Sequence, residues 1–228
     1  MPLIFNGVTI PENIANAFSF NGSDVTDVFI NGVQVWNQTL KAPPGSQTFT
    51  ASGTFTVPIG YTSVTICMCG GGGSGANTNS KSVAAGGGYA GTVYSGAIAV
   101  SSGASISVVV GAGGASQASD ATGNNGGQSK FGATVANGGS GGLFTSGGYT
   151  GQGASRTTCG GTANDGATDM TPFSGRMWGG QSSGFGNGGN SAVDYGSGSS
   201  GGVGSGGGGT TSGSSGAGGR GQVNISWS

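Results

Sequence analysis

Alternating apolar and polar residues predict short β-strands throughout the first 40 residues. The dipeptide Asn-Gly occurs at positions 6–7, 21–22 and 31–32, each time between apolar or β-branched residues. A tight type I′ hairpin turn needs positive φ at both central positions, and Asn-Gly is well suited to it. The clearest hairpin runs from Val28 to Trp36. We therefore predict an N-terminal β-hairpin attachment module over residues 1–40 and a Pro-containing linker over residues 41–47.

A second set of strand-like segments begins after the linker. Each is rich in β-branched or aromatic residues and is bounded by glycine, which is typical of strands in a small β-protein. The predicted strands are residues 48–51, 53–58, 62–69, 92–94, 96–100, 105–110, 130–136 and 222–227. A small sheet or sandwich is expected, closed by the C-terminal strand. The fold class is therefore mainly β with extensive irregular structure, and residues 48–228 are expected to form one glycine-rich domain.

Glycine dominates the second part of the chain. Of its 56 glycines only 6 precede residue 70, and no strand pattern is found between residues 137 and 221. A flexible linker is one interpretation, but the glycine run at 196–219 leads back into a strand. Polyglycine-II helices have three residues per turn and pack closely where glycine removes the Cβ. We therefore predict about eight such segments over residues 70–221, folded back at loops. Within the domain, residues 137–221 are assigned to the polyglycine bundle and the recognition loops, and residues 48–136 and 222–227 to the strands.

Composition excludes several classes of function. The chain has no histidine, so Ser-His-Asp triads, Cys-His pairs and His-ligated metal sites are excluded. Six Lys and Arg against seven Asp and Glu do not make a nucleic-acid-binding surface. No apolar run reaches the roughly 18 residues of a membrane span, and the N-terminus lacks the pattern of a classical secretory signal. The chain is predicted to be no enzyme and to use no cofactor or metal.

Three features that resemble functional sites are interpreted as structural or surface features instead. Residues 86–91 fit a G-x-G-x-x-G pattern, but no helix is predicted after them, as nucleotide binding would require. The seven carboxylates are interpreted as solvated loop residues rather than a glycosidase pair. Cys67, Cys69 and Cys159 are interpreted as small buried side chains, with a disulfide involving Cys159 as the alternative.

An ordered series of motifs carries a family resemblance. The series comprises residues 55–58, 62–66 leading into 70–73, 106–114, 126–132, 136–142 and 216–227. In order and spacing it resembles the glycine-rich domain of tailed-phage tail fibre and receptor-binding proteins, and residues 21–36 look like a short module common in phage tail proteins. The glycine packing is similar to that of the tip adhesin of T-even-type phages.

The resemblance implies a virion protein at the tail fibre tip, assembled in the host cytoplasm. Its implied partners are other tail proteins and a host receptor, either an outer-membrane protein or a surface glycan, with no nucleic acid and no membrane insertion. Two alternatives stay open: a structural tail or capsid decoration protein, and an ice-binding protein. The irregular inserts argue against the flat, repeated face that ice binding requires.

Large side chains in the glycine-rich part are the candidate receptor-binding residues. A glycine bundle has no apolar core to receive them, and aromatic and Arg side chains dominate binding hot spots; local packing within the loops is the alternative. The candidates are Phe144, Tyr149, Arg156, Phe173, Arg176, Trp178, Phe185 and Tyr195. Phe29 and Trp36 are the candidates for attachment through the N-terminal module.

Overall fold

The protein is all-β throughout the part of the chain that the structure describes. The computed structural model describes residues 41–78, 84–145, 185–190, 196–210 and 213–228, and the backbone of six short strands in the first 40 residues. These six strands pair as β1 (Leu3–Phe5) with β2 (Val8–Ile10), β3 (Ser19–Phe20) with β4 (Ser23–Asp24), and β5 (Asp27–Ile30) with β6 (Val33–Asn37). Each hairpin is connected through one Asn-Gly dipeptide, as predicted.

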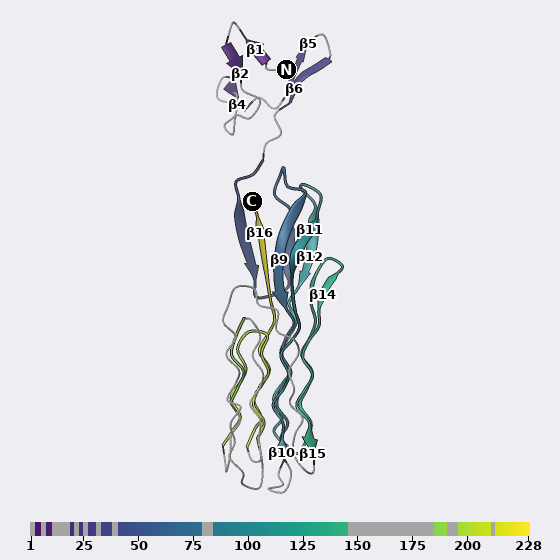
Figure 1. Ribbon diagram of the computed structural model, residues 1–228, viewed down its shortest axis with the longest axis vertical. Helices are drawn as coiled ribbons and strands as arrows, with labels where there is room; N and C mark the ends of the chain where they lie inside the picture. Colours follow the sequence, from purple (N-terminus) through teal and green to yellow (C-terminus); the bar gives the residue numbers. More distant parts are fainter. Residues whose placement is uncertain are drawn as a thin grey trace.

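Two antiparallel four-stranded sheets follow in the chain. Their strands run roughly along the vertical direction of Figure 1. The first has the order β11-β9-β16-β7 and contains β7 (Gly45–Phe49), β9 (Ser63–Cys69), β11 (Val93–Ala99) and β16 (Gln222–Trp227). The second has the order β14-β13-β12-β8 and contains β8 (Gly53–Thr56), β12 (Ser105–Val109), β13 (Ser129–Phe131) and β14 (Thr134–Ala136). The C-terminal strand β16 therefore lies inside its sheet, between β9 and β7, rather than at an edge.

Three strand predictions were wrong in detail. The single strand predicted over 130–136 is the β13–β14 hairpin, because Gly132 has a φ of 57° and reverses the chain. The two strands predicted over 92–94 and 96–100 form one strand, β11, with Gly96 inside it. A short strand that the glycine pattern concealed, β15 (Phe144–Thr145), pairs with β10 (Ala84–Ala85).

The apolar core lies between the two sheets. Strand β9 alternates along its length, so Val64, Ile66 and Met68 are buried while Ser63 and Thr65 face solvent. The ring of Phe55 fills the space between the sheets, with its centroid 5.9 Å from that of Phe131 and 5.8 Å from that of Trp227. The remaining core residues are Val57, Tyr61, Val108, Ala136, Val223 and Ile225.

Hydrogen bonds from the C-terminal end of the chain fix the first residues of this domain. The indole nitrogen Nε1 of Trp227 donates to the carbonyl oxygen of Pro43 over 3.0 Å. The guanidinium of Arg220 donates to the carbonyl oxygen of Thr50 over 3.1 Å. These bonds and strand β7, which begins at Gly45, place the predicted linker residues 43–47 against β16. The proposed division into an attachment module and a glycine-rich domain stays a prediction.

Several strands of the sandwich continue directly into a bundle of extended glycine segments. The central segment is residues 70–78, which continues β9 and is buried throughout. Its nine N–H groups donate to neighbouring carbonyl oxygens over 2.8 to 3.1 Å, and the acceptor changes with a period of three. Residues 70, 73 and 76 donate to the segment 86–92, residues 71, 74 and 77 to 121–128, and residues 72 and 75 to 213–221. This three-residue period is that of a polyglycine-II helix.

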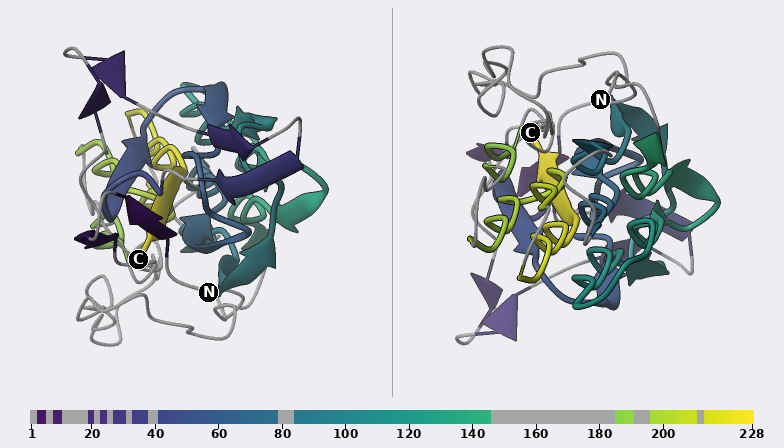
Figure 2. Two further views of the ribbon diagram at one scale, coloured as in Figure 1. Left: turned by 90° about the horizontal axis from the view of Figure 1, so that it is seen from above. Right: turned by 90° about the horizontal axis from the view of Figure 1, so that it is seen from below.

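Among the described residues, six segments surround the central one, and hydrogen bonds connect each to the next around a closed ring. In order around the ring they are 86–92, 137–143, 121–128, 111–117, 213–221 and 204–210. Hydrogen-bond registers make them alternate in direction: the central segment donates to three antiparallel neighbours and accepts from three parallel ones. Its last residues differ, because Thr78 donates to Thr210 of a parallel segment and Asn77 accepts from Ala121 of an antiparallel one. Figure 2 shows the segments end-on as three-sided coils. The backbone polar groups are thereby satisfied without an apolar core.

Glycine is required at the central segment because neighbouring backbones touch it. A Cβ built on Gly71, Gly73 or Gly75 would lie 2.1 Å from a carbonyl oxygen of an adjacent segment. No side chain fits at such a distance, so the sequence Gly70–Gly73 follows from the packing.

The non-glycine residues of the central segment make side-chain bonds of their own. Asn77 is fully buried, and its Nδ2 donates to the carbonyl oxygens of Gln117 and Gly213 over 3.0 and 2.6 Å. The Oδ1 of Asn77 has no hydrogen-bond partner. Asn77 thus connects one end of segment 111–117 and one end of segment 213–221 to the central segment.

The cysteines differ from one another. Cys69 is a free, buried thiol, as the favoured interpretation predicted. Cys67 is disulfide-bonded, so that interpretation was wrong for this residue. Cys159 lies outside the described residues.

Candidate functional site

One side of the ring is covered by further glycine segments and another is open. Segments 185–190 and 196–203 bond to each other and pack on 204–210 and 213–221. Among the described residues, nothing covers the outer side of 86–92, 137–143 and 121–128. We call the outer surface of these three segments the open face.

Segment 137–143 forms the middle of the open face, and its side chains point outward at every third residue. Cβ atoms on Gly138 and Gly141 would strike 121–128, and those on Gly139 and Gly142 would strike 86–92. The third position of each turn points to neither neighbour. It is occupied by Asn137, Ser140 and Leu143, and all three are exposed.

On the two flanking segments, the outward side chains also recur at every third residue. Tyr89 and Thr92 are half-buried on 86–92, while Thr122, Asn125 and Gln128 are exposed on 121–128. At one end of the open face, side chains of both flanking segments bond to Asn137 of the middle segment. Thr92 Oγ1 donates to the Asn137 carbonyl oxygen over 3.2 Å, and Gln128 Nε2 donates to Asn137 Oδ1 over 3.1 Å. Farther along the bundle, the described bond between a side chain and a neighbouring segment of this face is that of Asn125 with the N–H of Gly141, and the surface is hollowed.

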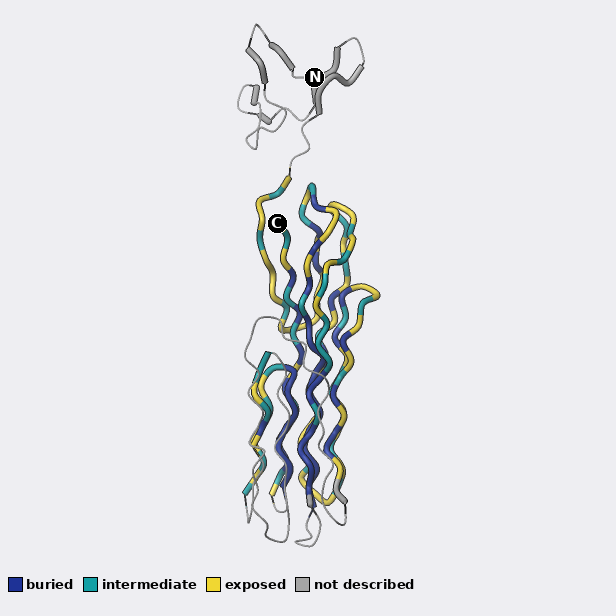
Figure 3. Tube along the Cα trace, in the orientation of Figure 1, coloured by how far each residue is buried: buried dark blue, intermediate teal, exposed yellow. Residues whose placement is uncertain are grey.

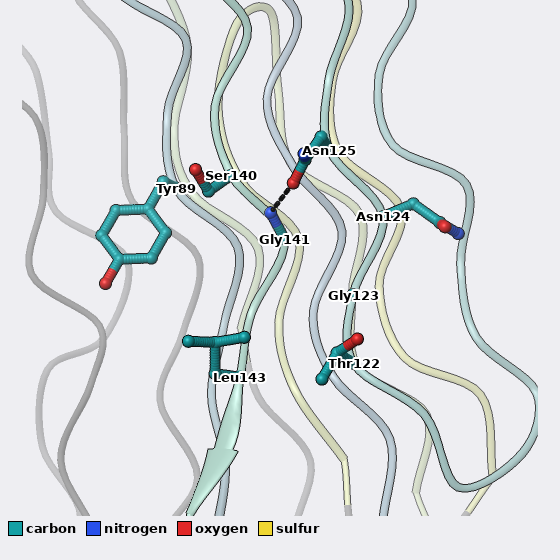
Figure 4. A pocket seen from close by; sticks show the side chains of 8 residues that line it. All are labelled: Tyr89, Thr122, Gly123, Asn124, Asn125, Ser140, Gly141 and Leu143. Carbon is teal, nitrogen blue, oxygen red and sulfur yellow. Dashed lines mark hydrogen bonds between the residues drawn. The ribbon is translucent and has the colours of Figure 1, made fainter.

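The hollow is an open groove of about 610 Å³, shown in Figure 4. Ser140, Gly141 and Leu143 of the middle segment lie along its floor, with the ring of Tyr89 on one side. The other side is formed by residues 122–125. Its volume falls within the range of about 300–1,000 Å³ that is common for small-molecule sites.

The polar groups of the groove are partly paired and partly available. The N–H of Gly141 donates to Asn125 Oδ1 over 2.9 Å, so this side chain replaces a missing neighbouring segment. The N–H of Ser140 and the carbonyl oxygen of Gly141 make no hydrogen bond to any described residue. With the hydroxyls of Tyr89, Thr122 and Ser140, they give the groove several hydrogen-bonding groups for a ligand.

The groove carries no charge. Its lining consists of glycine, hydroxyl and amide residues with one tyrosine and one leucine, and Leu143 is 48% exposed. Within the described ranges, no group of three or more Cys, Asp or Glu residues is placed to hold a metal ion. Such a lining suits a neutral, hydroxyl-rich ligand rather than a phosphate or a metal.

The glycine motif at residues 86–91 has a structural role in the bundle. Its N–H groups at Gly86, Gly88, Tyr89 and Gly91 donate to carbonyl oxygens of the two adjacent ring segments over 2.8 to 2.9 Å. These donors are therefore occupied, whereas a phosphate-binding loop holds its ligand with free N–H groups.

Most of the sequence-predicted site residues fall outside the described part of the chain. Phe144 begins strand β15, next to Leu143 of the groove, and Phe185 is half-buried at the start of segment 185–190. Phe29 and Trp36 lie on paired strands β5 and β6, opposite Gln34 and Val28 respectively. The candidates outside the described residues are Tyr149, Arg156, Phe173, Arg176, Trp178 and Tyr195. All of these assignments stay predictions.

The groove residues Tyr89, Thr122, Asn125 and Ser140 were missed by the sequence analysis. A signal was present in the order Asn-Gly-Gly-Ser-Gly-Gly-Leu at 137–143, where a non-glycine residue recurs at every third position. In a helix with three residues per turn, this period places the side chains in one outward row.

No helix long and apolar enough to cross a membrane is found in the described ranges. No curated protein matches the chain. A family model described as a glycine-rich domain matches residues 48–228, which is most of the chain. The match includes all the glycine segments described above and both sheets, except for the first three residues of β7. The chain therefore belongs to the glycine-rich domain family.

Proposed function

We propose that this chain is the receptor-binding tip adhesin of a tailed-phage tail fibre. Residues 1–40 attach it to another tail protein, and residues 48–228 present a host-recognition surface. The resemblance of the ordered glycine motifs to tail fibre proteins motivates the phage assignment.

The observation that carries the recognition role is the separation of scaffold from surface. The bundle is held by backbone hydrogen bonds, and glycine is required at positions facing a neighbouring segment. At outward positions such as Ser140 and Leu143 the carbonyl oxygens join the backbone bonding, but the side chains are exposed and take part in neither. They are free to vary without loss of the fold, which is what a surface adapting to different receptors requires.

Two other functions compete with this one. A structural decoration protein would use the same scaffold without binding cells. An ice-binding protein would need a flat, uniform face, whereas the open face mixes Tyr89, Ser140 and Leu143, whose sizes and polarities differ. Measurement of thermal hysteresis tests ice binding directly, and we expect none.

Antibody fragments raised against residues 48–228 provide the main test. On virions whose genome encodes this chain, we expect them to label the tail fibre tip and to block adsorption to host cells. Fragments raised against the major capsid protein serve as the control. Labelling of the capsid, or labelling of the tip without any effect on adsorption, would favour the structural alternative.

Point variants test the predicted recognition residues. Tyr149→Ala, Phe173→Ala, Trp178→Ala and Tyr195→Ala are compared with wild type for binding of the labelled protein to host cells, with folding checked by circular dichroism. Loss of a central aromatic side chain at a hot spot costs about 2 kcal/mol or more, about 30-fold in affinity. If all four variants fold and bind like wild type, these residues do not form the receptor site.

A further inference from the structure

We propose that the groove between Tyr89 and residues 122–125 is a binding site for a neutral saccharide. The inference rests on the proposed function, because it narrows the receptor to an uncharged glycan of the host surface. It assigns this recognition to the flank of the glycine bundle, away from the inserts that the sequence analysis singled out.

The geometry of the groove is fixed before any ligand arrives. Gly139 and Gly142 of the floor donate to the carbonyl oxygens of Gly71 and Ser74 in the central segment, each over 2.8 Å. Gly141 is locked by its bond to Asn125, and a Cβ at Gly141 would lie 2.0 Å from the carbonyl oxygen of Gly123. A preorganised floor avoids the entropy cost of ordering a loop on binding.

The chemistry of the lining matches a sugar. The partly exposed ring of Tyr89 and the side chain of Leu143 offer apolar surface for the C–H face of a pyranose. The N–H of Ser140 and the carbonyl oxygen of Gly141, which have no described partner, offer a donor and an acceptor to vicinal hydroxyls. Sugar hydroxyls would replace water at these groups with bonds of similar strength.

The absence of charge among the lining residues selects for a neutral ligand. A carboxylate or phosphate group entering this groove would lose hydration without meeting a cationic side chain in the lining. An extended peptide is less suitable, because the outward side chains of Ser140 and Leu143 prevent another glycine helix from approaching the floor closely. The repeating unit of a neutral polysaccharide is therefore the occupant that the lining fits best.

Nuclear magnetic resonance on the full-length, ¹⁵N-labelled protein tests the site without any host cell. The probes are methyl glycosides of glucose, galactose, mannose and N-acetylglucosamine, with methyl glucuronide as the acidic comparison. We expect saturable shift changes at the amides of Tyr89, Ser140 and Gly141 with at least one neutral glycoside and none with the glucuronide. Shifts confined to other regions, or preference for the acidic sugar, would overturn the proposal.

Variants of groove residues test whether the groove binds the saccharide. Ser140→Lys should fill the groove and reduce saccharide affinity at least about tenfold, whereas Ser107→Lys adds the same charge at an exposed position of β12 and should have no effect. Tyr89→Ala should weaken binding more than Tyr89→Phe, which keeps the ring. Equal affinity of Ser140→Lys and wild type for the glycoside would overturn the assignment.

The same variants distinguish failure of this inference from failure of the proposed function. If the protein binds host cells equally well before and after periodate oxidation of their glycans, and Ser140→Lys binds as wild type does, the groove proposal is wrong while the adhesin proposal stands. If the neutral glycosides shift the groove amides but antibody fragments against residues 48–228 do not affect phage adsorption, the saccharide site stands and the adhesin function fails.

Discussion

Gly72 lies so close to the backbone of Ser205 that a Cβ at position 72 would stand 2.0 Å from the carbonyl oxygen of Ser205. The two residues are 133 positions apart, and their contact joins the central segment to the ring segment 204–210. Backbone contacts of this kind take the place of side-chain packing in this half of the protein. In the bundle, replacing a tightly packed glycine should therefore destabilise the fold more than replacing an apolar side chain.

Replacing Gly72 by alanine should destabilise the protein severely. The added methyl group meets backbone atoms that cannot rotate away, so we expect a loss of about 3 kcal/mol or more in the free energy of unfolding. Gly96→Ala is the matched control, because its nearest contact is the end of the Tyr94 side chain at 3.2 Å, which can move. Chemical denaturation measures both. Similar stabilities for the two variants would contradict the packed-bundle structure.

Amide hydrogen exchange should show the three-residue period directly. The amides of Gly139 and Gly142 donate to the central segment and should be protected, whereas the amide of Ser140 has no described acceptor and should exchange quickly. Protection is also expected at bonded amides between residues 196 and 219, such as Gly207 and Gly218. Uniform fast exchange across these segments would mean that they are a flexible linker.

Substitution of Asn77 tests the side-chain bonds inside the bundle. Asn77→Asp removes the Nδ2 donor and sets a carboxylate against the carbonyl oxygens of Gln117 and Gly213. We expect a larger loss of thermal stability at neutral pH than at acidic pH, where the protonated carboxyl can donate one bond. Asn125→Asp, at an exposed position, is the control. Equal pH dependence of the two variants would show that position 77 is hydrated.

The thiol of Cys69 should be unreactive in the folded protein. Burial raises its pKa to about 12 from 9.0, although a hydrogen bond with the backbone of Gln222 opposes the shift. Reactivity requires the thiolate, so we expect no reaction with Ellman's reagent at mildly alkaline pH until denaturant is added. Cys69→Ala should abolish the thiol that unfolding exposes. Rapid reaction of the native protein would show that Cys69 is accessible.

The same pKa shift has a consequence for stability. Below pH 9 the thiol is neutral in both the folded and the unfolded chain and contributes no pH dependence. Between about pH 9 and pH 12 the unfolded chain loses this proton first, so the unfolded state binds fewer protons and stability falls as pH rises. In Cys69→Ala this part of the alkaline loss of stability should be absent, which pH-dependent thermal denaturation can measure.

The sequence alone determined the elements whose signals are local. The Asn-Gly pairs located three hairpins, since turn conformation depends on adjacent residues. Alternation located most strands of the sandwich, and clustered glycine predicted polyglycine-II packing because that packing excludes Cβ atoms. The hairpin at Gly132 was missed, because one glycine within a strand-like run does not reveal the sign of its φ.

The tertiary structure decided how these elements meet. Residues 70–78, which continue β9, become the central segment, although no local pattern distinguishes them from the other glycine runs. The candidate groove likewise depends on three segments that lie side by side, although its lining residues are up to 54 positions apart in the sequence. In a bundle held by backbone hydrogen bonds, the residue types do not show which segments are neighbours, since glycine can pack against any of them. Only the hydrogen-bond registers, set by the sheets at one end, select the arrangement.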